Sequence, residues 1–176
     1  MKCRIVVLFL IVIVGGAVGC GKKRVNLDPD VPKELTVVSL HGNTSRQTEE
    51  QLVELNSVVR WMDSNLLRLL KRSGFNAVLV KDIEKYQKGT GNLLVVDVDR
   101  YNAGNRIARV FISFGAGASS LDLDYKFFDK DGAVLEEWKD GVGSSKGGTY
   151  CAQALNKNVV WKIANLLNSQ YSPTVM

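Results

Sequence analysis

The sequence predicts a single α/β (α+β) domain in which a mixed sheet of about five strands is covered by two long helices. Three observations lead to this prediction. Short β-rich runs recur along the chain, two segments have the apolar period of amphipathic helices, and the first helical segment lies between two strand-like runs. A strand, a helix and a second strand in succession predict a right-handed parallel crossover. The order of the remaining runs adds antiparallel pairs and makes the sheet mixed.

The N-terminus has the anatomy of a secretory signal peptide. A short basic stretch from Met1 to Arg4 precedes an apolar run from Ile5 to Val14, and small residues follow. The apolar run is too short to span a bilayer, which takes about 20 apolar residues. We therefore expect residues 1–19 to be removed on export.

The residues that end this signal, Ala17-Val18-Gly19-Cys20, resemble the lipobox of bacterial lipoproteins, although Leu is more frequent than Ala at the first position. In that family the cysteine is lipidated, cleavage leaves it as the first residue, and its amine is then acylated. The resemblance implies lipidation of Cys20 and attachment to a membrane. Gly21 stands in place of the aspartate that signals inner-membrane retention, which implies the periplasmic face of the outer membrane.

Three segments are therefore expected: a signal peptide (1–19), a lipidated tether (20–34) and one α/β domain (35–176). The tether contains Pro29, Pro32 and little apolar content. With a net charge of +5 the chain is only mildly basic, and we do not expect an exported chain of this kind to bind nucleic acid.

The cysteines predict no disulfide framework. Of three cysteines, Cys3 leaves with the signal and Cys20 is committed to lipid, so Cys151 has no partner. We expect Cys151 to be a small buried hydrophobe near the start of the last helix.

The first strand and helix are expected on either side of the turn at His41-Gly42-Asn43. Leu35 to Leu40 is a β-rich run, and two capping boxes follow it, Thr44 with Gln47 and Thr48 with Gln51. Gly74 is placed to end the helix, with Phe75 able to fold back on it. Spacings of three and four give the helix one apolar stripe, formed by Leu52, Leu55, Val59, Met62, Leu66 and Leu69.

Three further elements follow in order. Ala77 to Val80 is apolar on both faces and predicts a second, buried strand. A polar connection with a turn of helix around Ile83 to Tyr86 leads to a strand from Leu93 to Arg100.

The C-terminal part predicts a hairpin and a helix. Strict alternation from Ser120 to Phe128 predicts a strand, and Asp129 to Gly132 a hairpin turn that leads into an antiparallel strand from Ala133 to Lys139. Gly141 to Gly148 is interpreted as a loop. The last helix runs from about Tyr150 to Ser169, with the stripe Ala152, Leu155, Val159, Ile163 and Leu166.

No catalytic or cofactor site is predicted. His41 is the single histidine, and nothing in the sequence requires it to meet Cys151. No Gly-x-Ser-x-Gly elbow is present, and Gly115 with Gly117 precede a strand instead of opening a helix. We therefore expect a protein that is not an enzyme and holds no cofactor.

A small-ligand or calcium-binding module is the alternative. Asp97 and Asp99 share one strand face, and Asp122 and Asp124 share another. If the two strands pair, four carboxylates converge, which suits calcium. The other interpretation is the solvated face of an antiparallel sheet.

The stretch from Arg106 to Phe114 is the candidate interaction surface. As a helix it carries Val110, Phe111 and Phe114 on one face, with Arg106 and Arg109 off that face. Such a segment can lie on a membrane interface or in the groove of a partner. Two alternatives remain open: a segment that closes one end of the sheet, or an extension of the neighbouring strands.

The residues around this stretch resemble a family of bacterial lipoproteins known only as a domain of unknown function. The likeness rests on Tyr101-Asn102-Ala103-Gly104-Asn105-Arg106, on Arg109, and on Phe114-Gly115-Ala116-Gly117, with Ser113 where Gly is more frequent. The layout is similar to periplasmic lipoproteins that assemble export or cell-wall machinery. The resemblance implies a non-catalytic interaction or assembly accessory of the cell envelope, with a protein partner, and supplies no catalytic residues.

Lipid anchorage gives the first testable prediction. The change Cys20→Ala removes the acceptor thiol, so we expect the protein to remain uncleaved at this site or to become soluble. Detergent-phase partitioning of the mature chain is the measurement. A mature Cys20→Ala protein that still partitions into the detergent phase would show that the anchor lies elsewhere.

Overall fold

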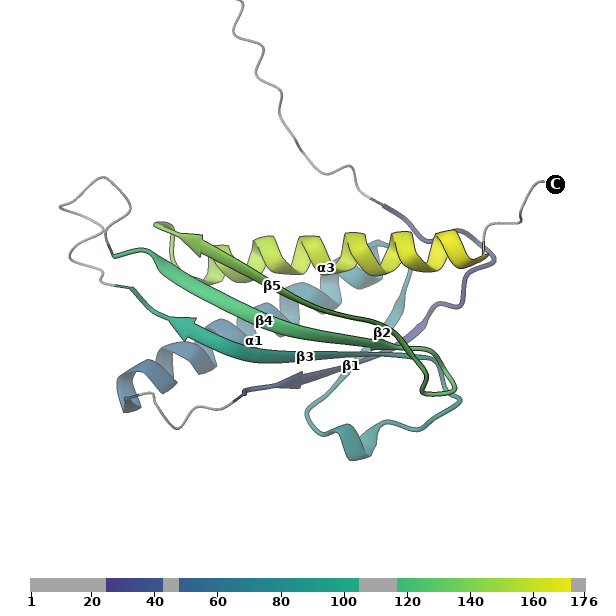
Figure 1. The fold of residues 1–176 in the computed structure, drawn as a ribbon, viewed down its shortest axis with the longest axis horizontal. Helices are drawn as coiled ribbons and strands as arrows, with labels where there is room; N and C mark the ends of the chain where they lie inside the picture. The colour runs from purple at the N-terminus through teal and green to yellow at the C-terminus, as the bar shows by residue number, and fades with distance from the viewer. Residues whose placement is uncertain (1–24, 43–47, 105–116, 172–176) are drawn as a thin grey trace, which may run out of the picture.

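The computed structural model describes residues 25–42, 48–104 and 117–171. They form one five-stranded mixed sheet with two long helices on one face (Figure 1). The predicted fold class is confirmed. In chain order the elements are β1 (Glu34–Leu40), α1 (Glu49–Arg72), β2 (Asn76–Val80), the 3-10 turn η1 (Ile83–Lys85), β3 (Asn92–Asn102), β4 (Ser119–Phe128), β5 (Val134–Ser144) and α3 (Gly148–Tyr171).

The sheet changes direction at β1. The strand order is β2-β1-β3-β4-β5, and β1 runs parallel to both of its neighbours. The β3–β4 and β4–β5 pairs are antiparallel. The chain therefore leaves β1, returns through α1 to β2 on one side, and crosses to β3 on the other side, as the parallel crossover predicted.

The two ends of α1 are fixed by local hydrogen bonds. Of the two predicted capping boxes, the second forms: Gln51 N–H donates to Thr48 Oγ1 at 3.4 Å, and Thr48 N–H donates to Gln51 Oε1 at 3.1 Å. At the C-terminal end Gly74 has φ of +98°, and the buried Phe75 donates its N–H to Leu70 O at 3.1 Å. This is the fold-back that glycine permits after a helix.

The core lies between the helices and one face of the sheet. Alternate residues of β3 and β4 point to this face, and the largest fully buried side chains there include Tyr125 and Phe127. The predicted stripes are buried at their centres and half-buried at Leu52, Leu69 and Leu166. Cys151 is fully buried as predicted. The opposite sheet face has a smaller apolar cluster around Val38, Leu93 and Val95.

Two predicted elements are corrected. The strand β2 was predicted to be buried on both faces, but it lies at the edge of the sheet and Val78 is 57% exposed. The predicted loop from Gly141 to Gly148 is wrong because β5 continues to Ser144, where it pairs with β4. Gly141 suits that pairing, since a Cβ there would lie 2.3 Å from Asp122 Oδ1.

Residues 25–33, which the sequence places in the tether, contact the domain. Val31 is buried, and Val25 and Leu27 are partly buried against the core. Leu27 N–H donates to Ser73 O at 2.9 Å. This part of the expected tether is therefore fixed to the folded domain.

Two tyrosines give a matched test of the core. The Tyr125 ring stacks on Trp138 with centroids 4.9 Å apart, but its buried hydroxyl has no hydrogen-bond partner among the described residues. Burial, with a contribution from the charge of Asp140, raises the pKa of Tyr125. The Tyr101 hydroxyl instead donates to Glu54 Oε1 at 3.0 Å.

We expect Tyr125→Phe to leave the free energy of unfolding unchanged or to raise it, because a buried unpaired hydroxyl is removed. We expect Tyr101→Phe to lower it by about 1 kcal/mol through the lost hydrogen bond. Urea denaturation of both variants is the measurement. A larger loss for Tyr125→Phe than for Tyr101→Phe would mean that the Tyr125 hydroxyl has a partner in solution.

Candidate functional site

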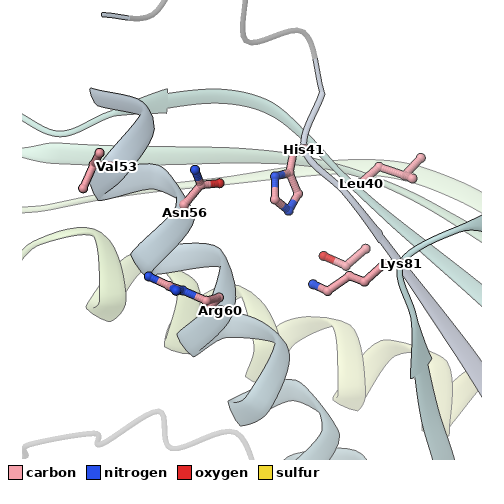
Figure 2. Close-up of a pocket in the computed structure, with 7 residues that line it drawn as sticks. Leu40, His41, Val53, Asn56, Arg60 and Lys81 are labelled. Atoms are coloured by element: carbon pink, nitrogen blue, oxygen red, sulfur yellow. The ribbon is translucent and has the colours of Figure 1, made fainter. Parts of the chain in front are cut away.

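A pocket of about 670 Å³ lies at the carboxyl end of β1, between that strand, α1 and the residue after β2 (Figure 2). Ligands of open α/β sheets bind outside the carboxyl ends of parallel strands, at the point where the strand order reverses. In this sheet the order reverses between β1 and β3, and the pocket lies at the neighbouring position, on the β2 side of β1. The lining residues are Ser39, Leu40, His41, Val53, Asn56, Arg60 and Lys81.

The periodicities of α1 and β1 bring the lining residues together. Val53, Asn56 and Arg60 are spaced by three and four, so they share a helix face beside the buried stripe. On β1, Ser39 follows Leu35 and Val37 on the face that packs against the helices.

Gly42 sets the path of the chain immediately after the pocket. It has φ of +61°, and a Cβ at this position would lie 1.7 Å from Val98 O. The backbone therefore passes directly over β3, and only glycine permits that approach. His41 is held at the pocket by the strand before it and this close passage after it.

Most polar groups of the pocket have no partner in the part of the chain that the structure describes. The side chains of His41, Asn56 and Arg60 make no hydrogen bond or ion pair to residues in the described ranges. The Ser39 hydroxyl is buried and also lacks a hydrogen-bond partner there. Figure 2 shows the Asn56 side chain on α1 directed toward His41 and the Lys81 side chain extending toward α1, while in this view the Arg60 guanidinium extends to the other side of the helix.

Lys81 is the exception, because its ammonium donates to Asp63 Oδ2. Asp63 is buried on α1, one turn after Arg60, and its second oxygen has no hydrogen-bond partner within the described ranges. The Lys81 charge neutralises the carboxylate beside the pocket, and Arg60 adds a positive charge. The pocket is therefore rich in hydrogen-bond donors and positive in net charge.

This pocket was not predicted from the sequence. The candidate interaction surface that was predicted, with Arg106, Arg109, Val110, Phe111 and Phe114, lies outside the described residues, as does Cys20. The ends that flank the surface are described: a Cβ at Gly104 would lie 2.2 Å from Gly117 O, so β3 and β4 meet closely at its base. The sequence feature that could have predicted the pocket is the recurrence of the polar residues Asn56, Arg60 and Asp63 at intervals of three and four beside the apolar stripe of the helix.

The predicted convergence of four aspartates is wrong. A bulge between Val98 and Arg100 places Arg100 opposite Asp122, at an Nε–Oδ2 distance of 3.8 Å. Asp97 does lie opposite Asp124, but Lys139 Nζ donates to Asp124 Oδ2 at 2.8 Å. That contact raises the pKa of Lys139. No group of three or more histidine, cysteine or acidic residues in the described ranges is placed to hold a metal ion.

His41 and Cys151 are not brought together. His41 lines the pocket at the end of β1. Cys151 lies in the first turn of α3, fully buried, with its Sγ 3.6 Å from Ser119 O. The structure therefore offers no nucleophile–base pair from these two residues.

Comparison with known proteins places the chain in a family without a known function. A family model described as "Domain of unknown function (DUF4410)" matches residues 26–161. No curated protein matches the chain. The dodecamer of a PelC variant from Paraburkholderia phytofirmans is 13% identical at a TM-score of 0.46, over 81% of this chain and 93% of that one. A homolog of neuraminyllactose-binding hemagglutinin from Helicobacter pylori is 12% identical at a TM-score of 0.42, over 83% and 88%.

The Lys81–Asp63 contact gives a prediction for the pocket wall. The change Lys81→Met leaves the buried Asp63 carboxylate without its cation, so we expect a loss of about 1–3 kcal/mol in the free energy of unfolding. Adding Asp63→Asn to Lys81→Met removes the unpaired charge and should recover part of that loss. Thermal and urea unfolding of the single and double variants measure the coupling. Equal stability of wild type and Lys81→Met would show that Asp63 is paired elsewhere or solvated.

Proposed function

This chain belongs to the DUF4410 family of domains of unknown function, and on that premise we propose that it is a lipid-anchored, non-catalytic binding domain of the bacterial cell envelope. In this proposal Cys20 carries the lipid and holds the domain at the periplasmic face of the outer membrane. The domain then binds another envelope protein, for which the surface from Arg106 to Phe114 is the candidate.

The observation that carries this proposal is where the N-terminal segment joins the domain. Asp28 N–H donates to Asn168 Oδ1 at 3.1 Å, and the Asn168 amide donates to Asn26 O at 2.9 Å. Asn168 is in the last turn of α3, and Ser73, which accepts from Leu27, follows α1. The chain therefore enters the domain at the end where both helices finish (Figure 1).

The short distance in sequence from Cys20 to this attachment supports a domain held close to the membrane. Four residues lie between Cys20 and Val25, so the linking chain spans at most about 18 Å. Within the described ranges, neither helix has a stretch apolar enough to cross a bilayer. In the proposal, the lipid at Cys20 attaches the domain to the membrane.

The opposite end of the domain supports a protein partner. The end of β3, the start of β4 and the start of α3 meet there, and Gly148 packs directly against Tyr101. A helix of 24 residues such as α3 rises about 36 Å. The described ends that flank the candidate surface thus lie about one helix length from the anchored end, where a soluble partner has access.

A double substitution tests the partner proposal. We expect Phe111→Ser with Phe114→Ser to abolish capture of the partner from crosslinked envelopes, while the thermal midpoint changes by only a few degrees. The matched control is Ile83→Ser with Val134→Ser, which removes two apolar side chains that are 50% and 52% exposed elsewhere. The control should keep both the partner and the thermal midpoint.

The opposite result is equally specific. If Phe111 and Phe114 close the core, their truncation costs about 3–5 kcal/mol each, and the variant unfolds or is degraded. That outcome would overturn the interaction surface while leaving the Cys20 anchor to its own test.

A further inference from the structure

We propose that the pocket at the carboxyl end of β1 binds a small organic anion through a carboxylate or phosphate group, with Arg60 recognising the anionic oxygens. This inference goes beyond the proposed membrane anchor and protein partner, and it depends on neither. It rests on the hydrogen-bond inventory of the pocket, on one buried hydroxyl, and on the pocket's size.

The hydrogen-bond inventory favours an acceptor-rich ligand. The Arg60 guanidinium has five N–H donors and no acceptor, and the Lys81 ammonium has three donors, of which Asp63 occupies one. The Asn56 amide and the Ser39 hydroxyl add further donors. No carboxylate is among the lining residues, and the Asp63 carboxylate beside Lys81 is already bonded to it. The complement of such a set is an anionic group with several oxygens, which arginine binds in bidentate geometry.

The Ser39 hydroxyl is the independent sign of a ligand. Ser39 is 3% exposed and lines the pocket, and its Oγ has no hydrogen-bond partner within the described ranges. A buried hydroxyl without a partner destabilises a fold, and native proteins keep few of them. The hydroxyl is closed to solvent without a ligand, so an oxygen of a bound anion would accept its hydrogen bond once the side chains around it move apart on binding. Exposed cations such as Arg60 alone would not indicate a site, but a buried unpaired donor beside them does.

Pocket size and apolar lining favour an organic ligand over a bare inorganic ion. A volume of about 670 Å³ is in the range of small-molecule sites. Val53 supplies an apolar side chain to the lining and is 67% exposed without a ligand, whereas the Leu40 side chain packs against the cluster on the opposite sheet face. We therefore assign the oxyanion to the Arg60 side and the carbon skeleton of the ligand to Val53.

Calorimetric titration of the full-length protein in non-ionic detergent tests the proposal. The probes are glucuronate for a carboxylate source, glycerol 3-phosphate for a phosphate ester, and inorganic phosphate. We expect one of the two organic anions to bind saturably with Kd of about 1 mM or tighter, and inorganic phosphate at least tenfold more weakly. The stronger organic probe identifies the source of the oxyanion. Failure of both organic anions to bind, or equal binding of inorganic phosphate, would overturn the proposal.

Two variants separate recognition from general charge. Arg60→Gln should weaken the organic anion about tenfold or more. Arg68→Gln makes the same charge change two turns along α1, outside the lining, and should leave the affinity unchanged. Equal effects of both variants would show a non-specific charge effect and sink the proposed site.

Ser39→Ala supplies a readout that does not depend on charge. It should weaken binding by a smaller factor while keeping or raising the thermal midpoint, because it removes an unpaired hydroxyl. Unchanged affinity in Ser39→Ala would remove the buried hydroxyl from the site and overturn the assignment as stated. A lowered thermal midpoint would also contradict it, since the hydroxyl would then have a protein partner.

Discussion

The packing of α1 and α3 on one face of the sheet is the interaction on which the rest of this structure depends. The buried residues of β4 alternate, whereas the first half of β3 is buried on both faces, because the helices cover one sheet face and a smaller apolar cluster lies on the other. Asn156 ties the two helices together inside this layer, donating from Nδ2 to Met62 O at 2.9 Å and to Asn65 Oδ1 at 3.1 Å. These buried amide bonds fix the relative position of the helices, because an unpaired amide in the core would be costly.

The pocket is a direct consequence of this one-sided packing. Leu35, Val37 and Ser39 occupy successive positions on the covered face of β1, so the strand carries its core periodicity to its carboxyl end, beside the polar flank of the apolar stripe of α1. At that point the helix presents Asn56 and Arg60 to the strand. Side chains on one face repeat every 2.0 residues on the strand and every 3.6 residues on the helix. Because the two periods differ, a polar face of α1 meets the last residues of β1, and a polar site forms beside the buried face.

Most helices and strands were predicted correctly from the sequence, because the residues that begin, end or pattern each one lie close together in the chain. The capping box at Thr48, the glycine stop at Gly74 and the alternation before Phe128 are each complete within a few residues. The exposure of Val78 and the extension of β5 to Ser144 were missed because both depend on which strand lies at an edge, which is a property of the whole sheet. The pocket was missed for the same reason: Ser39 and Lys81 lie 42 positions apart and meet only through parallel pairing of β1 and β2. The candidate surface around Phe111 lies outside the described residues and stays a prediction.

The location of a buried polar atom without a hydrogen-bond partner indicates whether it affects stability alone or also ligand binding. A buried donor or acceptor without a partner costs about 1–3 kcal/mol, a large part of the 5–15 kcal/mol that holds a domain folded. Within the described ranges, the Tyr125 hydroxyl is such an atom inside the core, where no ligand has access. Ser39 Oγ and Asp63 Oδ1 lie instead at and beside one pocket that also holds the uncompensated charge of Arg60. Unpaired buried atoms also occur at Asn92, Asp97 and Asp124, but the pair at Ser39 and Asp63 lies next to a donor-rich pocket, where a ligand could relieve the loss of stability. The unpaired Tyr125 hydroxyl also lowers stability, but no ligand can reach it. Stacking of the Tyr125 ring on Trp138 is the interaction that offsets this cost.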